Sequence, residues 1–402
     1  MIDLTGRDRP DIVLLIALLV LFMIGLTAVY SASTVISESD LFSRQLTWSI
    51  IGLFAFLVGT IISLRRLEEI SPIAYVSVSL MLLITLFIGR GPADRWLIIG
   101  PLHLQPSEIA KAGLIAMTAW WLASQKVRPR KFGEILIFLT VLPAVVLTAL
   151  QPDLGTAVSM LLVVLAMFIW AGYGIGWIVL LVSPILAAIS SMNIFLWLGF
   201  MLILTMILYR RKYSIPTWIA FVGGNSAVAA VTPMAWNMLK PYQQSRLITF
   251  LNPSSDPHGS GWNIIQSEVA VGSGGFSGQG LLQGAQKELA FLPARHTDFV
   301  FSVWAEETGF IGCVILLAAF FVLFWRIIIA ARKSVNPFNS LVAAGIAAYI
   351  GIHVFVNVGM TLGIMPVTGL PLPLISYGGS QLVTVLFLLG LVVNAGMYWR
   401  EV

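Results

Sequence analysis

Residues 12–33, IVLLIALLVLFMIGLTAVYSAS, contain no charged side chain. An α-helix needs about 20 consecutive apolar residues to cross the hydrocarbon core of a bilayer, so this stretch predicts a transmembrane helix. The same composition extends along the chain, because 58% of its 402 residues are hydrophobic and only 10% are charged. Soluble domains carry about 25% charged residues. The sequence therefore indicates a polytopic membrane protein.

Further apolar runs, bounded by charged residues or by clusters of proline and glycine, predict the other spans. Together with the first, the runs lie at 12–33, 45–64, 71–89, 108–125, 134–150, 154–172, 175–190, 194–209, 215–237, 301–330, 337–360 and 379–399. We expect an all-α protein with about 12 transmembrane helices in one integral membrane domain, residues 1–402.

The basic residues predict the orientation, because cytoplasmic loops collect Lys and Arg. If the N-terminus is cytoplasmic, 15 of the 23 Lys and Arg residues lie on the inner side. Both termini are then expected in the cytoplasm, and the long polar segment 238–300 is expected on the outer face. This distribution explains the net charge of +5 without a nucleic-acid partner. Cys313 is the only cysteine, which excludes an internal disulfide.

Several catalytic motifs are missing from the sequence. It contains no Gly-x-x-x-x-Gly-Lys, no His-Glu-x-x-His and no Gly-x-Ser-x-Gly pattern. ATP-driven chemistry, zinc-dependent hydrolysis and a serine triad are unsupported, and no nucleotide cofactor is expected. The energy for any reaction must come from the substrate or from a gradient.

Polar clusters close to the spans are the candidate functional residues, because an ionisable side chain at mid-helix costs roughly 2.5–3.5 kcal/mol in a membrane. Four clusters are expected on the outer side: Arg95 and Trp96 with Gln105, Glu108 and Lys111; Gln151 to Asp153; Lys240 to Arg246; and Arg295 to Asp298, followed by Glu306 and Glu307.

The first three clusters each have two interpretations. Glu108 and Lys111 lie three residues apart on one helical face, and they form either a local ion pair or a wall for an anionic headgroup. Asp153 either caps the following helix or helps to hold a cation. Lys240 and Arg246 meet either the phosphates of ordinary phospholipids or the anion of a substrate.

Asp298 is the strongest candidate for a catalytic base. It lies at the expected border of water and hydrocarbon, where partial desolvation strengthens a carboxylate as a base. The alternative is a simple helix cap. Glu306 and Glu307 lie further into the next span, where at least one of them must face a polar interior or pair with a cation.

Residues 366–380, PVTGLPLPLISYGGS, interrupt the apolar sequence with prolines and glycines. This density predicts an irregular re-entrant segment, which a membrane protein tolerates only where the segment is buried in protein or lines a cavity. Free backbone amides around Ser376, Tyr377, Gly378 and Gly379 are candidate ligands for phosphate oxygens, as at the N-terminus of a helix.

Motifs spread in order over most of the chain resemble the shape, elongation, division and sporulation (SEDS) family. They are 105–111 (QPSEIAK), 151–155 (QPDLG), Asp256-Pro257 leading to Gly261 and Gln266-Ser267, 272–275 (GSGG), Leu292-Pro293 with 296–299 (HTDF), Glu306-Glu307 and 371–379 (PLPLISYGG). The chain is more similar to the rod-shape branch than to the division branch, in which a lysine is usual at the position of Thr368.

The resemblance implies a peptidoglycan glycosyltransferase that polymerises lipid II for cell elongation. It places the protein in the bacterial cytoplasmic (inner) membrane with its active site on the outer face. The implied partners are lipid II, a class B penicillin-binding protein and other membrane proteins of the elongation complex. Asp298 matches the essential aspartate of the family, and Trp96 matches a tryptophan linked to function.

Two departures from the family pattern stand out. The glutamates that often precede the aspartate by eight and four residues are Ala290 and Ala294 here, with Glu288 close to the first. The family usually has ten spans, so we expect a ten-helix core and an extra pair of helices within 175–237.

The expected reaction joins the C4 hydroxyl of one disaccharide-lipid to the anomeric carbon of another and expels polyprenyl pyrophosphate. Asp298 would act as general base. Positive charge for the leaving group would come from Arg95, Lys111, Lys240 and Arg246, or from a divalent cation, Mg²⁺ or Mn²⁺, held partly by Asp153, Glu306 or Glu307. The candidate substrate-binding residues are Arg95, Trp96, Glu108, Lys111, Lys240, Arg246, Gln266, Ser267, His296, Thr297, Ser376, Tyr377, Gly378 and Gly379.

Two other classes of function stay open. A flippase or transporter of a lipid-linked precursor also needs intramembrane acids and broken helices, although such carriers bind near the midplane and often have inverted repeats. A non-catalytic scaffold would anchor a penicillin-binding protein through its helices.

Overall fold

The structure is a computed structural model of the chain, and it describes residues 8–33, 40–89, 91, 95–99, 102–124, 133–238, 244, 261–284 and 295–398. Its first half contains the helices α1 (Ile12–Ser33), α2 (Asp40–Ile61), α3 (Leu64–Ile88), α4 (Pro106–Ser124), α5 (Gly133–Leu150) and α6 (Leu154–Trp170). A short hairpin of two strands, β1 (Leu97–Ile99) and β2 (Leu102–Leu104), precedes α4.

The second half continues with α7 (Ile175–Ser190), α8 (Ile194–Arg210), α9 (Ile215–Trp218), a π-helical turn (Ile219–Gly223), α10 (Gly224–Met238), α12 (Trp262–Ser273), α14 (Val300–Lys333), α15 (Pro337–Thr361) and α16 (Gly379–Met397). Side-chain caps start two of these helices. Asn193 accepts hydrogen bonds from Phe195 N and Leu196 N, and Asn336 accepts one from Phe338 N.

The prediction of an all-α polytopic protein is confirmed, and every predicted apolar run is helical over most of its length. Seven of the described helices are long and apolar enough to cross a membrane, and three shorter helices are also apolar. The antiparallel hairpin β1–β2, with Leu97 opposite Leu104, was not predicted. α2 and α3 also begin earlier than predicted, because polar residues such as Arg44 and Arg65 join their first turns.

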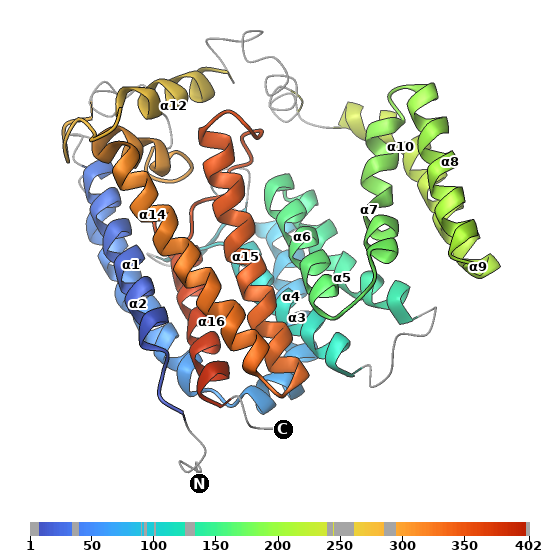
Figure 1. Cartoon of the computed structure of the whole chain (residues 1–402), viewed down its shortest axis with the longest axis horizontal. Coiled ribbons are helices and arrows are strands. Elements are labelled where there is room, and N and C mark those ends of the chain that lie inside the picture. Colours follow the sequence, from blue (N-terminus) through green and yellow to red (C-terminus); the bar gives the residue numbers. More distant parts are fainter. Residues whose placement is uncertain are drawn as a thin grey trace.

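The centre of the main bundle is formed by α4, α15 and α16, and the other helices of this bundle pack around them (Figure 1). Glycines let α2 and α16 approach closely. A Cβ on Gly390 would lie 2.3 Å from Phe56 O, and one on Gly59 would lie 2.5 Å from Phe387 O. Small residues at such interfaces are a usual device of membrane helix packing. Asn394 of α16 adds hydrogen bonds to Gly59 O and Ile62 O at 3.2 and 2.6 Å.

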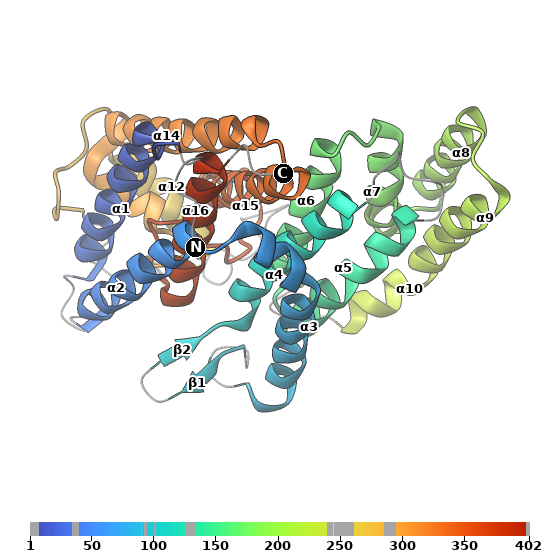
Figure 2. The same cartoon turned by 90° about the horizontal axis from the view of Figure 1, so that it is seen from below.

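The helices α7 to α10 form a separate group at one side of the molecule (Figures 1 and 2). They pack mainly on one another, and the contacts between this group and the rest of the bundle run mainly from α7 to α6. Within the group, Asn225 Nδ2 donates to Ser183 Oγ at 2.9 Å. This peripheral group covers the residues in which the extra pair of helices was predicted, 175–237.

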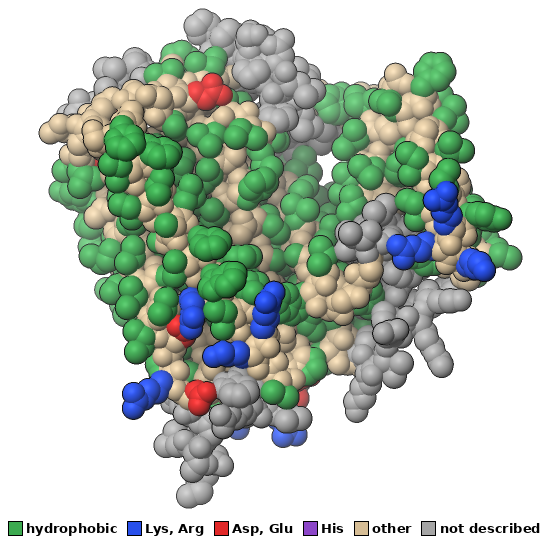
Figure 3. All heavy atoms as spheres, viewed as in Figure 1, with side chains coloured by type: hydrophobic (Ala, Val, Ile, Leu, Met, Phe, Trp, Pro, Cys, Tyr) green, Lys and Arg blue, Asp and Glu red, His purple; other side chains and the backbone are tan. Residues whose placement is uncertain are grey.

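Many of the lysine and arginine side chains visible in Figure 3 lie at the lower part of the main bundle, where α1 begins and α16 ends (Figure 1), and others lie at the right edge beside the helices α7 to α10. At the lower end of the main bundle Arg326 pairs with Asp11, and Arg332 and Lys333 close α14. The arrangement agrees with the orientation expected from the sequence. The sides of the membrane themselves stay a prediction.

Candidate functional site

The segment between α15 and α16 is irregular and buried, as its prolines and glycines predict. Leu370, Leu372, Leu374 and Ile375 have at most 3% of their surface exposed. Gly25 of α1 makes room for this segment, because a Cβ there would lie 2.0 Å from Leu374 O. The segment therefore reaches into the protein core, where irregular backbone is tolerated in a membrane protein.

We call His296, Thr297 and Asp298 the aspartate loop. The backbone carbonyls of these three residues accept hydrogen bonds from the C-terminal part of the chain. His296 O accepts from Tyr377 N at 2.8 Å, and Thr297 O accepts from Ser376 Oγ at 2.6 Å. Asp298 O accepts from Asn357 Nδ2 at 3.0 Å. The backbone of the predicted base is thus fixed by α15 and by the irregular segment.

The carboxyl group of Asp298 points toward Gly369. Its Oδ2 atom lies 3.6 Å from the position that a Cβ on Gly369 would take, and Gly369 has a φ of +73°. α14 begins at Val300 with Phe299 at the cap position, so the alternative in which Asp298 is the N-cap of this helix is wrong. Asp298 as a whole residue is partly exposed.

Asp153 occupies the N-cap of α6, as one of its two interpretations predicted. Its Oδ1 accepts from Thr156 N at 3.2 Å, and its Oδ2 lies 3.2 Å from Arg95 Nη1 and 3.5 Å from Gln105 Nε2. The side chains of Arg95 and Asp153 are 24% and 5% exposed. The first two polar clusters therefore meet at the start of α6.

The irregular segment, residues 366–380, contacts both the start of α6 and the aspartate loop. A Cβ on Gly155 would lie 2.4 Å from Thr368 O, and Thr368 precedes the glycine that faces Asp298. Ser380 Oγ accepts from Gln105 N at 3.0 Å and donates to His103 O at 3.2 Å. Gly379, which starts α16, packs against Trp48 of α2. Three of the four predicted clusters thus converge on residues 366–380.

Glu108 and Lys111 form the predicted ion pair, with Lys111 Nζ 2.8 Å from Glu108 Oε1. Both side chains are about 2% exposed, so the pair lies inside the bundle and not on its outer surface. Trp96 is partly buried and packs beside Gly91. A role of these residues in binding a substrate stays a prediction.

Residues 274–284, which we call the glycine strap, hold a break in α14. Gly309 in that helix has a φ of +65° and a ψ of −163°. Phe310 N and Ile311 N donate to Gly275 O and Phe276 O at 3.0 and 3.2 Å. The GSGG motif therefore supports the backbone of the helix that follows Asp298, and a direct substrate contact is not needed to explain it.

Glu306 and Glu307 lie just before this break and are both buried. Glu307 Oε1 accepts a hydrogen bond from Ser31 Oγ of α1, and a Cβ on Gly284 would lie 2.7 Å from Glu306 Oε2. Glu307 thus has a polar partner inside the bundle, and the prediction that at least one of these acids faces a polar interior or pairs with a cation stays a prediction.

Ser267, which the resemblance placed among substrate-binding residues, joins three helices. Its Oγ lies 2.6 Å from Ser302 Oγ and 2.7 Å from Thr361 O. It is fully buried, whereas the neighbouring Gln266 is partly exposed. The two basic candidates Lys240 and Arg246 lie outside the described residues.

The three acids suggested for a divalent cation do not form one centre. Asp153 is engaged by a backbone amide and by Arg95 at the start of α6, and Glu306 and Glu307 belong to α14. Within the described ranges, no group of three or more His, Cys, Asp and Glu residues is placed to hold a metal ion. A divalent cation held partly by one of these acids stays a prediction.

Sequence reasoning missed several polar residues of the site. Asn357, His353, Tyr349 and Gln381 were not among the predicted site residues, although an ionisable group in a span is itself a signal. Arg44 of α2 hydrogen-bonds the Tyr377 side chain. Burial raises the pKa of the Tyr377 hydroxyl above its ordinary value, and the Arg44 guanidinium opposes that effect.

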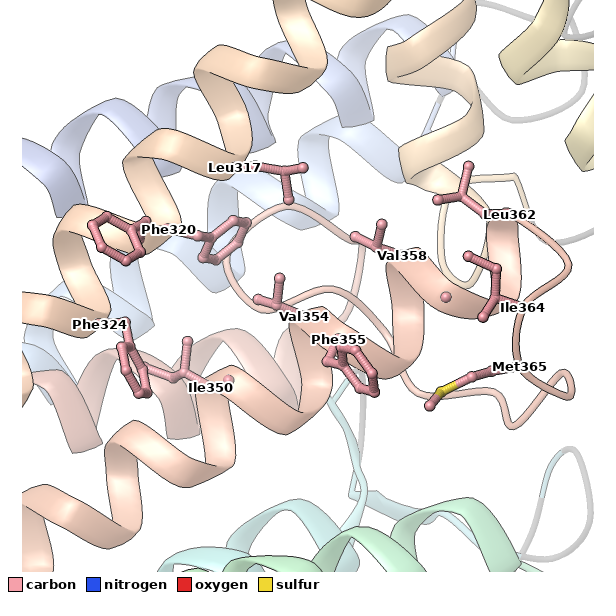
Figure 4. Close-up of a pocket in the computed structure, with 13 residues that line it drawn as sticks. Leu317, Phe320, Phe324, Ile350, Val354, Phe355, Val358, Leu362, Ile364 and Met365 are labelled. Carbon is pink, nitrogen blue, oxygen red and sulfur yellow. The ribbon is translucent and has the colours of Figure 1, made fainter.

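An apolar cavity of about 430 Å³ lies between α14 and α15. Leu317, Phe320 and Phe324 face it from α14, and Val354 and Val358 face it from α15 (Figure 4). Met365 closes the end nearest to the irregular segment. Its lining has no charged residue, which suits a hydrocarbon chain or an apolar helix.

Comparisons with known proteins agree with this geometry. The FtsW/RodA/SpoVE family, described as cell cycle proteins, matches residues 12–200 and 197–401. A protein of Treponema pallidum named peptidoglycan glycosyltransferase RodA is 34% identical, with 97% of this chain and 98% of the relative covered.

Two solved structures are also similar. One is described as the structural coordination of polymerization and crosslinking by a peptidoglycan synthase complex, and it matches with a TM-score of 0.71 and 30% identity over 98% of this chain and 99% of the other. The rod shape determining protein RodA of Thermus thermophilus matches with a TM-score of 0.65 and 27% identity over 98% of both chains. This multi-pass membrane protein therefore belongs to the FtsW/RodA/SpoVE (SEDS) family, as its motifs indicated.

Proposed function

We propose that this chain is a peptidoglycan glycosyltransferase that polymerises lipid II into glycan strands for cell elongation. The observation that carries the proposal is the fixed position of a partly exposed acid, Asp298, among three polar clusters at one end of the bundle. The name of the Treponema pallidum relative and the family match support the same activity. We place the protein in the bacterial cytoplasmic membrane with this end on the outer face.

In the proposed reaction, Asp298 removes the proton from the C4 hydroxyl of the acceptor disaccharide. The hydroxyl oxygen forms a bond to the anomeric carbon of the donor, the bond from that carbon to the pyrophosphate oxygen breaks, and the configuration inverts. Polyprenyl pyrophosphate leaves with the bonding electrons. The carboxylate therefore needs an open side, and the leaving group needs positive charge nearby.

The described residues offer two sources of that positive charge. Arg95 is about a quarter exposed and keeps further N–H donors beyond the one at Asp153. The N-terminus of α16 at Gly378 and Gly379 directs backbone amides and the positive end of the helix dipole toward the same region. Lys240 and Arg246 are proposed to add to this charge. A Mg²⁺ or Mn²⁺ ion that accompanies the pyrophosphate is a further proposed source.

The proposed partner is a class B penicillin-binding protein, whose crosslinking would follow polymerisation. The similar structure of a complex that coordinates polymerization and crosslinking supports this pairing. We propose that the partner's transmembrane helix packs across the apolar cavity between α14 and α15 and inserts side chains into it, because the lining is entirely apolar and the cavity ends beside the irregular segment. Val354→Trp, which fills the cavity, should reduce stimulation by the partner and leave the basal rate unchanged.

Purified protein supplied with lipid II in detergent tests the proposal. Asp298→Asn should lower the rate of glycan-chain formation about 10²–10⁴-fold, which is the usual contribution of a general base. Asp11→Asn is the matched control, because Asp11 pairs with Arg326 at the opposite end of the molecule. Full polymerisation by Asp298→Asn would remove this residue from the role.

The same preparation separates the rival functions. A flippase would move a fluorescent lipid II across vesicles without forming chains. A scaffold would do neither, and chains would appear only when an active partner enzyme is added.

A further inference from the structure

A chain of buried polar groups lies beneath the irregular segment and consists of Glu108, Lys111, Tyr349, His353 and Gln381. All five are at most 4% exposed. Lys111 Nζ lies 2.8 Å from Glu108 Oε1 and 3.4 Å from His353 Nε2, and it sits 5.1 Å from the centre of the Tyr349 ring. The ammonium group therefore has an acceptor or a π-face in three directions.

This geometry determines the tautomer of His353. A lysine ammonium group can only donate, so the Nε2 atom facing Lys111 must accept. The ring proton is then on Nδ1, which donates to Pro371 O at 3.3 Å. A neutral imidazole thus connects a buried ion pair with a backbone carbonyl of the irregular segment.

The connection continues from Pro371 to the aspartate loop. Gln381 Nε2 also donates to Pro371 O, at 3.0 Å. The next amide, Leu372 N, donates to Ser376 Oγ at 2.8 Å, and Ser376 Oγ donates to Thr297 O at 2.6 Å. Thr297 directly precedes Asp298, so a few hydrogen bonds separate His353 from the backbone of the proposed base.

We propose that His353 is a positioning residue that fixes residues 371–376 against the Glu108–Lys111 pair and thereby sets the place of Asp298 for the reaction. His353 does not touch the substrate. The inference rests on the proposed glycosyltransferase activity. The proposal gives a role to a buried histidine that was not among the predicted site residues.

Substitutions at His353 test the proposal through a separation of kcat from KM. His353→Leu removes both the acceptor for Lys111 and a donor to Pro371 O, so kcat should fall at least about tenfold while KM for lipid II stays within about twofold, because only the placement of the base changes. His353→Gln provides an acceptor and a donor and should recover kcat to within about threefold of the wild type.

Gln381→Leu is a second variant that removes the other donor to Pro371 O and leaves His353 intact. It should lower kcat in the same way. Asn394→Leu is the control for loss of a buried amide, because Asn394 bonds Gly59 O and Ile62 O away from the site. It should lower resistance to unfolding and leave kcat of the folded protein unchanged.

Hydrogen exchange gives a readout that does not depend on activity. In His353→Leu, the amides of Leu372 and Tyr377 should exchange at least about tenfold faster than in the wild type, whereas those of α8 should not change. If the wild type forms no glycan chains but these amides respond, the proposed function fails and the positioning role survives. If Gln and Leu at position 353 behave alike, or if the two amides keep their protection, His353 does not position the segment.

Discussion

The glycine strap offers a graded test of how the structure holds the break in α14, because Gly275 and Gly278 of the strap and Gly272 of the preceding helix α12 have different surroundings. A Cβ on Gly278 would lie 2.2 Å from Glu307 O, and its φ is +82°. Gly275 has a φ of +54° with nothing within 4 Å of a Cβ. Gly272 has an ordinary helical φ and equally open surroundings.

Alanine at each position separates the cost of a left-handed backbone conformation from the cost of a steric overlap of the new Cβ atom. Gly272→Ala should stabilise the protein by roughly 0.5–1 kcal/mol, because alanine loses less backbone entropy in a helix. Gly275→Ala should cost about 1–2 kcal/mol for the left-handed conformation. Gly278→Ala carries the same conformational cost and adds an overlap with backbone atoms that is worth about 1–3 kcal/mol, so its total is about 2–5 kcal/mol.

Unfolding of the purified variants in a series of denaturing detergent concentrations measures the order of their stabilities. The rate of lipid II polymerisation is measured on the same samples. Gly278→Ala should also lower polymerisation most, since its contact lies on the helix that Asp298 precedes. Equal destabilisation by Gly275→Ala and Gly278→Ala would show that the strap does not press on Glu307, and the description of the break would be wrong.

Three further outcomes are expected. Asn357→Leu removes the side-chain donor to Asp298 O and to Leu370 O, at about 1–3 kcal/mol for each carbonyl, and should slow glycan-chain formation at least about tenfold in an initial-rate assay. Arg95→Gln should lower the free energy of unfolding more than Arg65→Gln. The side chains of Arg65 and its partner Glu69 are 83% and 67% exposed, and exposed ion pairs contribute only about 0–1 kcal/mol. Equal losses of stability in the two variants would contradict this expectation. Glu307→Gln should leave the Mg²⁺ concentration for half-maximal polymerisation unchanged, and an increase of about tenfold would identify Glu307 as a metal ligand.

Much of the architecture follows from local sequence. Uninterrupted apolar runs are long enough to cross a bilayer, so each predicted run corresponds to a helix, although α2 and α3 begin several residues earlier than predicted. The prolines and glycines of 366–380 can continue neither a helix nor a lipid-facing strand, which made the buried irregular segment predictable. The cap at Asp153 follows from an acid at the start of an apolar run.

The arrangement around Asp298 was less accessible, because it depends on contacts between distant parts of the chain. Asn357, Ser376 and Tyr377 bind the aspartate loop across some sixty to eighty positions, and no periodic pattern encodes such pairings. The hairpin β1–β2 was missed because each strand has only three residues, although Gly100-Pro101 between two apolar triplets is a turn signal.

His353 shows what the sequence contained but did not explain. A histidine in an apolar run signals an unusual environment. Its meaning depends on Lys111, which is contributed by a different helix 242 positions earlier. Only the packed bundle brings the two together.

The hydrogen bonds to the aspartate loop have a consequence for biosynthesis. The three donors described above, Asn357 Nδ2, Ser376 Oγ and Tyr377 N, belong to α15 or to the segment after it, and these are made after Asp298 itself. During translation the acid enters the membrane before its supports exist. We expect a nascent chain that stalls before residue 357 to carry Asp298 without these contacts and to form no glycan chains.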